Sequence, residues 1–314
     1  DKSAMTTPEK NFRPTTFDDY QGQDKAKKIL KIAIKAAQIK GECLDHILIS
    51  GPSGTGKTTL ANIIANESGQ PIKCISGPAI KKVDDLIDVL SEVEENSILY
   101  ADEVHSLNKK LQEILYFALE QFVIDTNIDG TPLRMDIPHF TFIGSTTELG
   151  GLEEPCRNRF PIQIKLVPYS NVQMFDVVAG VFNAMGVTCD DDCMAMIARV
   201  SRGVPRNVNS YCRRVYDMAL VMNDGEITPE VVEDTFDLLD INKYGLNSLD
   251  MEYLKHLYSA RKTVGVDSIS LALGTDKKSI EEVVEPWLFK AQFATKGPRG
   301  RKITQKGIEV IESL

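Results

Sequence analysis

Residues Gly51 to Thr58 read Gly-Pro-Ser-Gly-Thr-Gly-Lys-Thr and match the pattern G-x-x-x-x-G-K-T at every position. A short apolar run, residues 46–50, precedes this loop, and residues 59–67 have the apolar spacing of a helix. A glycine-rich loop between a strand and a helix can direct backbone N–H groups and the positive end of the helix dipole at a phosphate. The segment therefore predicts a site for a nucleoside triphosphate.

The side chains of this loop have separate expected roles. Lys57 can reach the β- and γ-phosphates, and the hydroxyl of Thr58 can bind Mg²⁺. The other residues expected to line the nucleotide are Gly51, Pro52, Gly54, Thr55, Gly56 and Thr59.

Two later strands are expected to complete the site. An apolar run, residues 97–101, ends at Asp102 and Glu103. A carboxylate at such a strand end can hold Mg²⁺, and the next carboxylate can orient and polarise the attacking water. Asp102 is therefore the predicted metal ligand and Glu103 the predicted activator of water. A further apolar run ends at Thr146, whose hydroxyl would face the γ-phosphate.

Two arginines outside these strands each have two interpretations. Arg159 either forms a surface salt bridge, which its spacing alone favours, or stabilises charge on a phosphate bound by a neighbouring subunit. Arg206 precedes a helix, where it either pairs with an acid or reports the state of the γ-phosphate to the rest of the chain.

Composition is typical of a soluble globular protein with two or three domains. The chain has 314 residues, 42% hydrophobic and 26% charged, with a formal net charge of −9. No apolar run approaches the ~20 residues of a membrane span, and the polar N-terminus lacks the apolar core of a signal peptide. The six cysteines form no C-x-x-C pair, which favours reduced thiols in the cytoplasm.

The elements that must hold these residues fall into three predicted domains. Residues 1–170 alternate strand and helix patterns, which is typical of an α/β domain with a parallel sheet. Residues 171–242 contain four helical stretches and predict a lid domain. Residues 243–314 predict a helix-turn-helix unit followed by a β-wing.

A hairpin is expected within the first domain. Two alternating runs, residues 123–128 and 133–137, flank a turn that begins with Asp129 and Gly130, a strong hairpin signal. The hairpin either contacts a partner or DNA, or is a plain edge hairpin.

Positive charge is concentrated near the end of the chain. Between Pro286 and Lys306 there are six Lys or Arg residues and no Asp or Glu, which leaves −15 on the rest of the chain. Phosphate contacts of a DNA-binding protein would therefore concentrate on this wing.

Together these motifs resemble those of the AAA+ ATPases, and within them the RuvB family, the bacterial motors that branch-migrate Holliday junctions in recombination and repair. The matching strings follow the family's order from about Phe12 to the end of the chain and include LDHILISGPSGTGKTTLANIIANE, ADEVHSLN, IGSTT, RNRF, RGVPRNVN and GPRGR. The resemblance implies an α/β fold with a P-loop parallel-sheet ATPase domain, an α-helical lid and a C-terminal winged helix. It also implies ATP and Mg²⁺ as cofactors and a hexameric ring.

The resemblance also gives roles to individual residues. Phe12 and Arg13 match the segment under the adenine, and Tyr169 matches a nucleotide contact. Thr146 matches the γ-phosphate sensor. Arg159 matches the finger that acts on the neighbouring subunit, and Arg206 matches the sensor of the lid. The wing residues matched to the DNA contacts, or lying between them, are Lys296, Arg299 and Arg301.

The implied partners are double-stranded DNA, with a four-way junction, and the junction-binding protein RuvA. The hairpin at 123–137 is several residues shorter than the family's usual RuvA-docking hairpin, which leaves open whether RuvA or a divergent partner docks there. Ala101, Glu148 and Asn158 also depart from the residues common in the family, but none of these changes removes a phosphate-handling group.

Two other functions are compatible with these residues. A clamp-loader or helicase-loader ATPase would use the same core to assemble partners without pumping DNA. An ATP-gated DNA-binding regulator would use the winged helix to read sequence. Branch migration of a four-way junction separates the motor from the loader, and DNA-stimulated hydrolysis separates it from the regulator.

Overall fold

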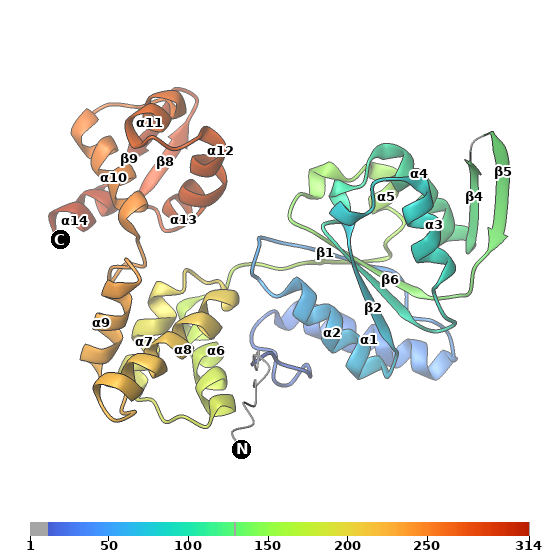
Figure 1. Ribbon diagram of the computed structural model, residues 1–314, viewed down its shortest axis with the longest axis horizontal. Coiled ribbons are helices and arrows are strands. Elements are labelled where there is room, and N and C mark those ends of the chain that lie inside the picture. The colour runs from blue at the N-terminus through green and yellow to red at the C-terminus, as the bar shows by residue number, and fades with distance from the viewer. Residues whose placement is uncertain (1–11, 129, 314) are drawn as a thin grey trace, which may run out of the picture. The chain divides into compact units, whose positions relative to one another are not determined.

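The computed structural model describes residues 12–128 and 130–313 (Figure 1). The chain forms two compact units, one made of Asp1–Val181 with Val204–Asn207 and the other of Phe182–Gly203 with Val208–Leu314. The expected finer division at residues 170 and 242 stays a prediction.

The first unit is built on the expected parallel sheet, which has five strands in the order β2-β3-β6-β1-β7. Its strands are β1 (Ile47–Ser50), β2 (Ile72–Ser76), β3 (Ile98–Asp102), β6 (Thr141–Thr146) and β7 (Ile162–Lys165). The central strands read as unbroken apolar runs because helices cover both faces of the sheet. This order puts the carboxyl ends of β3, β6 and β1 side by side, so residues that follow these strands meet at one edge.

Helices pack on both faces of this sheet (Figure 1). On one face are α1 (Asp24–Lys40) and α2 (Lys57–Ser68), which share a core with Ile47 and Ile49. On the other are α3 (Val83–Ser91) and α4 (Lys109–Gln121), which pack against Leu48 and Leu99. Successive strand residues point to opposite faces, and this alternation assigns each to its core. Shorter elements are η1 (Gly77–Ala79), η2 (Val104–Ser106), η3 (Leu149–Gly151) and α5 (Glu154–Arg157).

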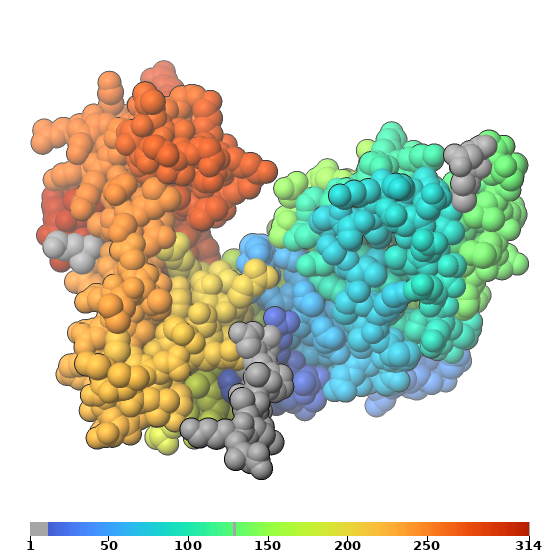
Figure 2. Space-filling view, in the orientation of Figure 1, coloured from blue at the N-terminus to red at the C-terminus, as the bar shows by residue number. Residues whose placement is uncertain are grey.

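The predicted hairpin is confirmed. Strands β4 (Val123–Ile128) and β5 (Thr131–Asp136) pair antiparallel as a separate two-stranded sheet at the edge of the unit (Figure 1). In the space-filling view this segment, coloured green, forms an outer rim of the same unit (Figure 2). Ile128 is paired with Thr131, so the second strand starts two residues earlier than the sequence predicted. Pro132 is tolerated there because this small sheet has only edge strands.

Four helices follow the sheet, and their bounds lie within two residues of the helical stretches that the sequence predicts at 171–185, 190–201, 207–223 and 229–239. They are α6 (Asn171–Met185), α7 (Asp191–Val200), α8 (Pro205–Met222) and α9 (Pro229–Leu238). Among the described residues, no helix is long and apolar enough to cross a membrane.

The last part of the chain forms the expected helix-turn-helix and wing. Its elements are α10 (Ser248–Ala260), α11 (Val266–Leu273), α12 (Lys277–Ser279), η4 (Ile280–Val284), α13 (Glu285–Lys290), β8 (Ala294–Gly297), β9 (Gly300–Ile303) and α14 (Gln305–Glu312). The sequence predicted one helix over residues 278–291, but the backbone widens into a π-turn at η4. Pro286 explains the widening, because its ring would clash with the carbonyl of Glu282 in a regular α-helix.

Candidate nucleotide site and DNA-binding wing

The loop between β1 and α2 has the backbone shape that its glycines predict. Gly54 and Gly56 lie in the left-handed region with φ of 77° and 95°, and a Cβ on Gly54 would come within 2.6 Å of Val204 Cγ1. Gly56 caps α2, whose first-turn N–H groups are free to bind an anion. The buried Thr55 hydroxyl donates to the Pro52 carbonyl at 2.7 Å and fixes the turn.

The Lys57 ammonium folds back over this loop. It donates to the carbonyl oxygens of Gly51 at 2.9 Å and Pro52 at 3.1 Å. Burial lowers the pKa of Lys57, and the nearby carboxylates of Glu103 and Asp102 partly oppose that shift. Within the described part of the chain, both hydrogen-bond partners of the ammonium are neutral carbonyl oxygens, so phosphate oxygens can replace them.

Thr58 and Asp102, the two predicted metal ligands, are joined by a buried hydroxyl. The Tyr100 hydroxyl lies 3.1 Å from Thr58 Oγ1 and 3.1 Å from Asp102 Oδ1. The Ser145 hydroxyl lies 2.9 Å from Tyr100 and also donates to Asp102. A hydroxyl and a carboxylate are hard oxygen donors that fit Mg²⁺, which takes its other ligands from phosphates and water. Residues 12–128 and 130–313 hold no group of three His, Cys, Asp or Glu that could bind a metal.

Glu103 and Thr146 lie beside each other at the ends of β3 and β6. Glu103 Oε2 accepts hydrogen bonds from the Thr147 N–H at 3.1 Å and the Thr147 hydroxyl at 2.9 Å. His105 Nδ1 lies 2.9 Å from Thr146 Oγ1 and 3.1 Å from Glu103 Oε2, so it contacts both. The structure therefore brings the predicted water activator and the predicted γ-phosphate sensor together.

The sequence left the role of His105 open between a surface histidine and a residue involved in sensing, and three further residues of this edge were not predicted to belong to the site. Tyr100 and Ser145 lie in apolar runs and read as core, and Thr147 follows the predicted sensor. A signal was present for Tyr100, because residues two apart on a strand share a face and Tyr100 precedes Asp102 by two.

The residues expected around the base lie near the start of the chain and shortly after β7, the last strand of the sheet. Tyr169 is buried, and a Cβ on Gly22 would lie 2.8 Å from its ring. The Tyr20 hydroxyl lies next to the loop, 3.3 Å from where a Cβ on Gly56 would stand. Phe12 is half-buried and Arg13 is exposed. The assignment of Phe12, Arg13 and Tyr169 to the nucleotide stays a prediction.

The two arginines differ in position. Arg206 lies at the loop, where its Nη1 is 3.4 Å from Ser53 Oγ and its backbone N–H donates to Gly54 at 3.4 Å. Arg159 is exposed and forms an ion pair with Glu120 on α4. The salt bridge that its spacing favoured is thus present, and its action on a neighbouring subunit stays a prediction.

The three wing cations are not equivalent. Arg299 is exposed between the two strands of the wing. Lys296 is exposed but donates to Glu281 Oε1 at 3.1 Å. Arg301 is only 5% exposed, and its guanidinium donates to both oxygens of Glu285 at 2.7 and 3.1 Å and to Glu281 at 2.6 Å.

The sequence expectation treated these three cations alike. Both glutamates lie just before the segment in which no acid was counted, and the helix preceding the wing carries them to β9. A role in DNA binding stays a prediction for all three cations, and Arg301 is the one whose side chain is not at the surface.

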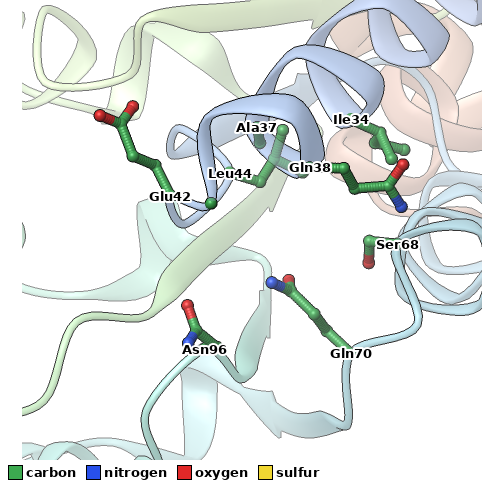
Figure 3. Close-up of a pocket in the computed structure, with 9 residues that line it drawn as sticks. Ile34, Ala37, Gln38, Glu42, Leu44, Ser68, Gln70 and Asn96 are labelled. Atoms are coloured by element: carbon green, nitrogen blue, oxygen red, sulfur yellow. The ribbon is translucent and has the colours of Figure 1, made fainter.

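A cavity of about 230 Å³ opens at the amino ends of the strands, opposite the end that carries the phosphate-binding loop (Figure 3). Leu44, Gln70 and Asn96 line it, and they lie ahead of β1, β2 and β3 at the amino ends of these strands. None of the residues predicted for the nucleotide site lines this cavity. It is therefore separate from the phosphate-handling edge.

Three family models match consecutive parts of the chain. The Holliday junction DNA helicase RuvB P-loop domain matches residues 12–166, the RuvB AAA lid domain 169–242 and the RuvB C-terminal winged helix domain 243–312.

Relatives match over nearly the whole chain. The Holliday junction branch migration complex subunit RuvB of Campylobacter hominis is 40% identical over 308 residues, which cover 96% of this chain and 91% of that protein. The protein of the same name from Wolbachia sp. subsp. Brugia malayi is 39% identical over 305 residues, covering 96% and 94%. A solved structure, the Thermotoga maritima RuvB Holliday junction branch migration motor, is 37% identical with a TM-score of 0.85, covering 96% and 98%.

Proposed function

Because the chain belongs to the RuvB family, whose members named above are subunits of the Holliday junction branch migration complex, we propose that it is an ATP-driven motor that moves four-way DNA junctions. One observation supports this most strongly. A single edge of the parallel sheet gathers a phosphate-binding loop, two oxygen donors for a cation, a carboxylate for water and a hydroxyl for the γ-phosphate.

Hydrolysis uses five side chains of this edge. Lys57 offsets charge on the β- and γ-phosphate oxygens. Thr58 and Asp102 hold Mg²⁺, which when bound neutralises further charge on those oxygens. Glu103 accepts a proton from the water that attacks the γ-phosphorus, as the bond from that phosphorus to the β,γ-bridging oxygen breaks. Thr146 donates a hydrogen bond to the γ-phosphate.

Arg159 acts on the site of a neighbouring copy in a ring, which we take to be hexameric. Its guanidinium is exposed on the surface, and an exposed ion pair such as that with Glu120 is worth only ~0–1 kcal/mol, so it can be exchanged for a phosphate at little cost. Arg206 contacts the loop from the first turn of α8, so a change at the γ-phosphate can be passed along that helix.

DNA is the proposed load of the motor. The wing offers Arg299, Lys296 and the further lysine Lys302 as contacts to phosphates, which carry no sequence information and suit a protein that moves along a duplex. The hairpin β4–β5 is the proposed docking surface for a junction-binding partner of the RuvA type. A cytoplasmic location is part of this proposal.

The test is branch migration of a synthetic four-way junction with ATP, with and without cognate RuvA. The motor is expected to convert the junction to its products with ATP and Mg²⁺, and Lys57→Ala is expected to abolish conversion. Hydrolysis without conversion under both conditions would contradict the motor and favour a loader. Sequence-selective DNA binding without DNA-stimulated hydrolysis would favour a regulator.

A further inference from the structure

Tyr100 is a core residue of β3 whose hydroxyl reaches the nucleotide site. Its side chain is 1% exposed, and its ring packs in the core that α1 and α2 cover. An apolar ring would be enough for that packing. The hydroxyl instead lies within 3.1 Å of three oxygens, which belong to Thr58, Ser145 and Asp102.

The direction of these hydrogen bonds is fixed by the carboxylate. Asp102 can only accept, and Ser145 donates to it. Tyr100 donates its single proton to Asp102 Oδ1 at 3.1 Å, so its oxygen accepts the proton of Thr58. Because Thr58 donates away from the loop, the lone pairs of its oxygen are left for a cation. The hydroxyl protons of Tyr100 and Ser145 thus both go to the metal-binding carboxylate of Asp102.

We propose that Tyr100 is a positioning residue for Mg²⁺, because its hydroxyl aligns the Thr58 hydroxyl and the Asp102 carboxylate before the ion arrives. The inference rests on the proposed function, since it assumes that these two groups hold the ion. Without the tyrosine oxygen, the Thr58 hydroxyl loses its acceptor and is free to rotate. Part of the binding energy of the ion would then be spent on orienting its ligands.

The test compares Tyr100→Phe with the unaltered full-length protein in a binding assay without hydrolysis. Binding of a fluorescent ADP analogue is titrated across Mg²⁺ concentrations and, separately, in excess chelator. The Mg²⁺ concentration for half-maximal stimulation of binding is expected to rise about three- to tenfold, which is the effect of losing one or two hydrogen bonds. Affinity in chelator is expected to stay the same.

Tyr116→Phe is the matched control. It removes another hydroxyl of the same unit, one that donates to Gln112 Oε1 at 3.2 Å, outside the nucleotide site. Its Mg²⁺ requirement is expected to match the unaltered protein. Ser145→Ala removes the second hydroxyl on Asp102 and is expected to shift the requirement in the same direction as Tyr100→Phe, by less. Thermal unfolding of each variant checks that the fold is kept.

Two results would overturn the proposal. One is an unchanged Mg²⁺ requirement in Tyr100→Phe. The other is an equal loss of ADP affinity with and without Mg²⁺, which indicates a purely structural role. The assay contains no DNA, so failure of branch migration would count against the motor without affecting this result.

Discussion

The nucleotide site and the wing both depend on positive charge, but they hold it in opposite ways. The Lys57 ammonium rests on two neutral carbonyl oxygens of its own loop. In the wing, Arg301 is buried against Glu285, and Lys296 donates to Glu281. Phosphate oxygens can take the place of carbonyls without leaving a charge behind. Arg301 cannot leave Glu285 without stranding a buried carboxylate, which is costly.

This difference separates two kinds of cation. Lys57 is available to a ligand, whereas Arg301 is fixed and fastens β9 to the helix before it. Charge counted along the sequence therefore overstates what the wing offers to DNA. The exposed Arg299 is the wing cation most comparable to Lys57.

The largest expected effect is on ATP turnover, and it tests whether Arg159, like Lys57, is available to a phosphate. Arg159→Ala should leave ATP binding nearly intact and lower turnover by ~10³–10⁵-fold, the range of arginine fingers in other enzymes. Steady-state hydrolysis and nucleotide binding are measured together. Glu120→Gln is the control, because it removes the partner of Arg159 but keeps the arginine, and should keep turnover. Equal effects of the two variants would mean that the arginine serves only its ion pair.

Arg301→Ala should destabilise the winged helix by about 3–5 kcal/mol, because Glu285 is left buried without its partner. Denaturant unfolding of the second unit measures the loss. Arg299→Ala is the matched exposed variant and should change stability by no more than ~0.5 kcal/mol. It should instead weaken DNA binding and lower the salt slope by about one. If Arg301→Ala kept its stability and only lost DNA affinity, Arg301 would act as a DNA contact like Arg299, and the proposed structural role of Arg301 would be wrong.

Glu281→Gln tests whether a wing cation that is paired with a carboxylate can be made available to DNA. It should release Lys296 and raise affinity for duplex DNA a few-fold at low salt, with the gain fading as salt rises. Fluorescence anisotropy at several salt concentrations follows the change. Glu282→Gln alters the net charge equally, but its carboxylate lies 3.9 Å from Lys278 and touches neither wing cation. The same gain in both variants would assign the effect to net charge alone.

The last expected effect concerns His46, just before β1, the strand that leads into the loop. Buried His46 accepts the Phe142 N–H on Nδ1 and donates from Nε2 to the Leu119 carbonyl, so only the neutral ring fits. Burial lowers the pKa of His46 in the folded state. The unfolded chain then binds the extra proton first, and stability falls as pH drops below about 6.5, by at most ~1.4 kcal/mol per pH unit.

Urea unfolding between pH 5 and 7.5 measures this slope, and His46→Gln should flatten it because the amide offers the same donor and acceptor without titrating. An identical slope in the variant would place the pH dependence elsewhere in the sheet.

The sequence predicted the parts of the site that backbone geometry determines. The loop at Gly51 to Thr58 and the strand-end carboxylate Asp102 need only a strand, a turn and a helix in the right order, and apolar periodicity reveals these. Contacts across strands were not predictable in the same way. The Tyr100 hydroxyl meets Thr58 only because β3 and β1 flank β6, an order that the sequence does not state.

The wing shows the same limit. The cations of residues 294–303 were visible as a cluster, but their partners lie in a helix whose register depends on a π-turn. That turn arises where Pro286 opposes a regular helix, and it helps to set which side Glu281 and Glu285 present. The number of basic residues in the wing was correct from the sequence, but their ion pairs with Glu281 and Glu285 could be known only from the structure.

The central claim is that ATP is cleaved at a site completed by a second copy of the chain. Mixing the two inactive variants Lys57→Ala and Arg159→Ala tests it directly, with ATP hydrolysis and junction migration as readouts and a tag pull-down to verify mixed assemblies. Interfaces that join an intact loop to an intact arginine should then restore hydrolysis to about a quarter of the unaltered rate, as random mixing in a head-to-tail ring gives. Mixed assemblies no more active than the separate variants would contradict the claim.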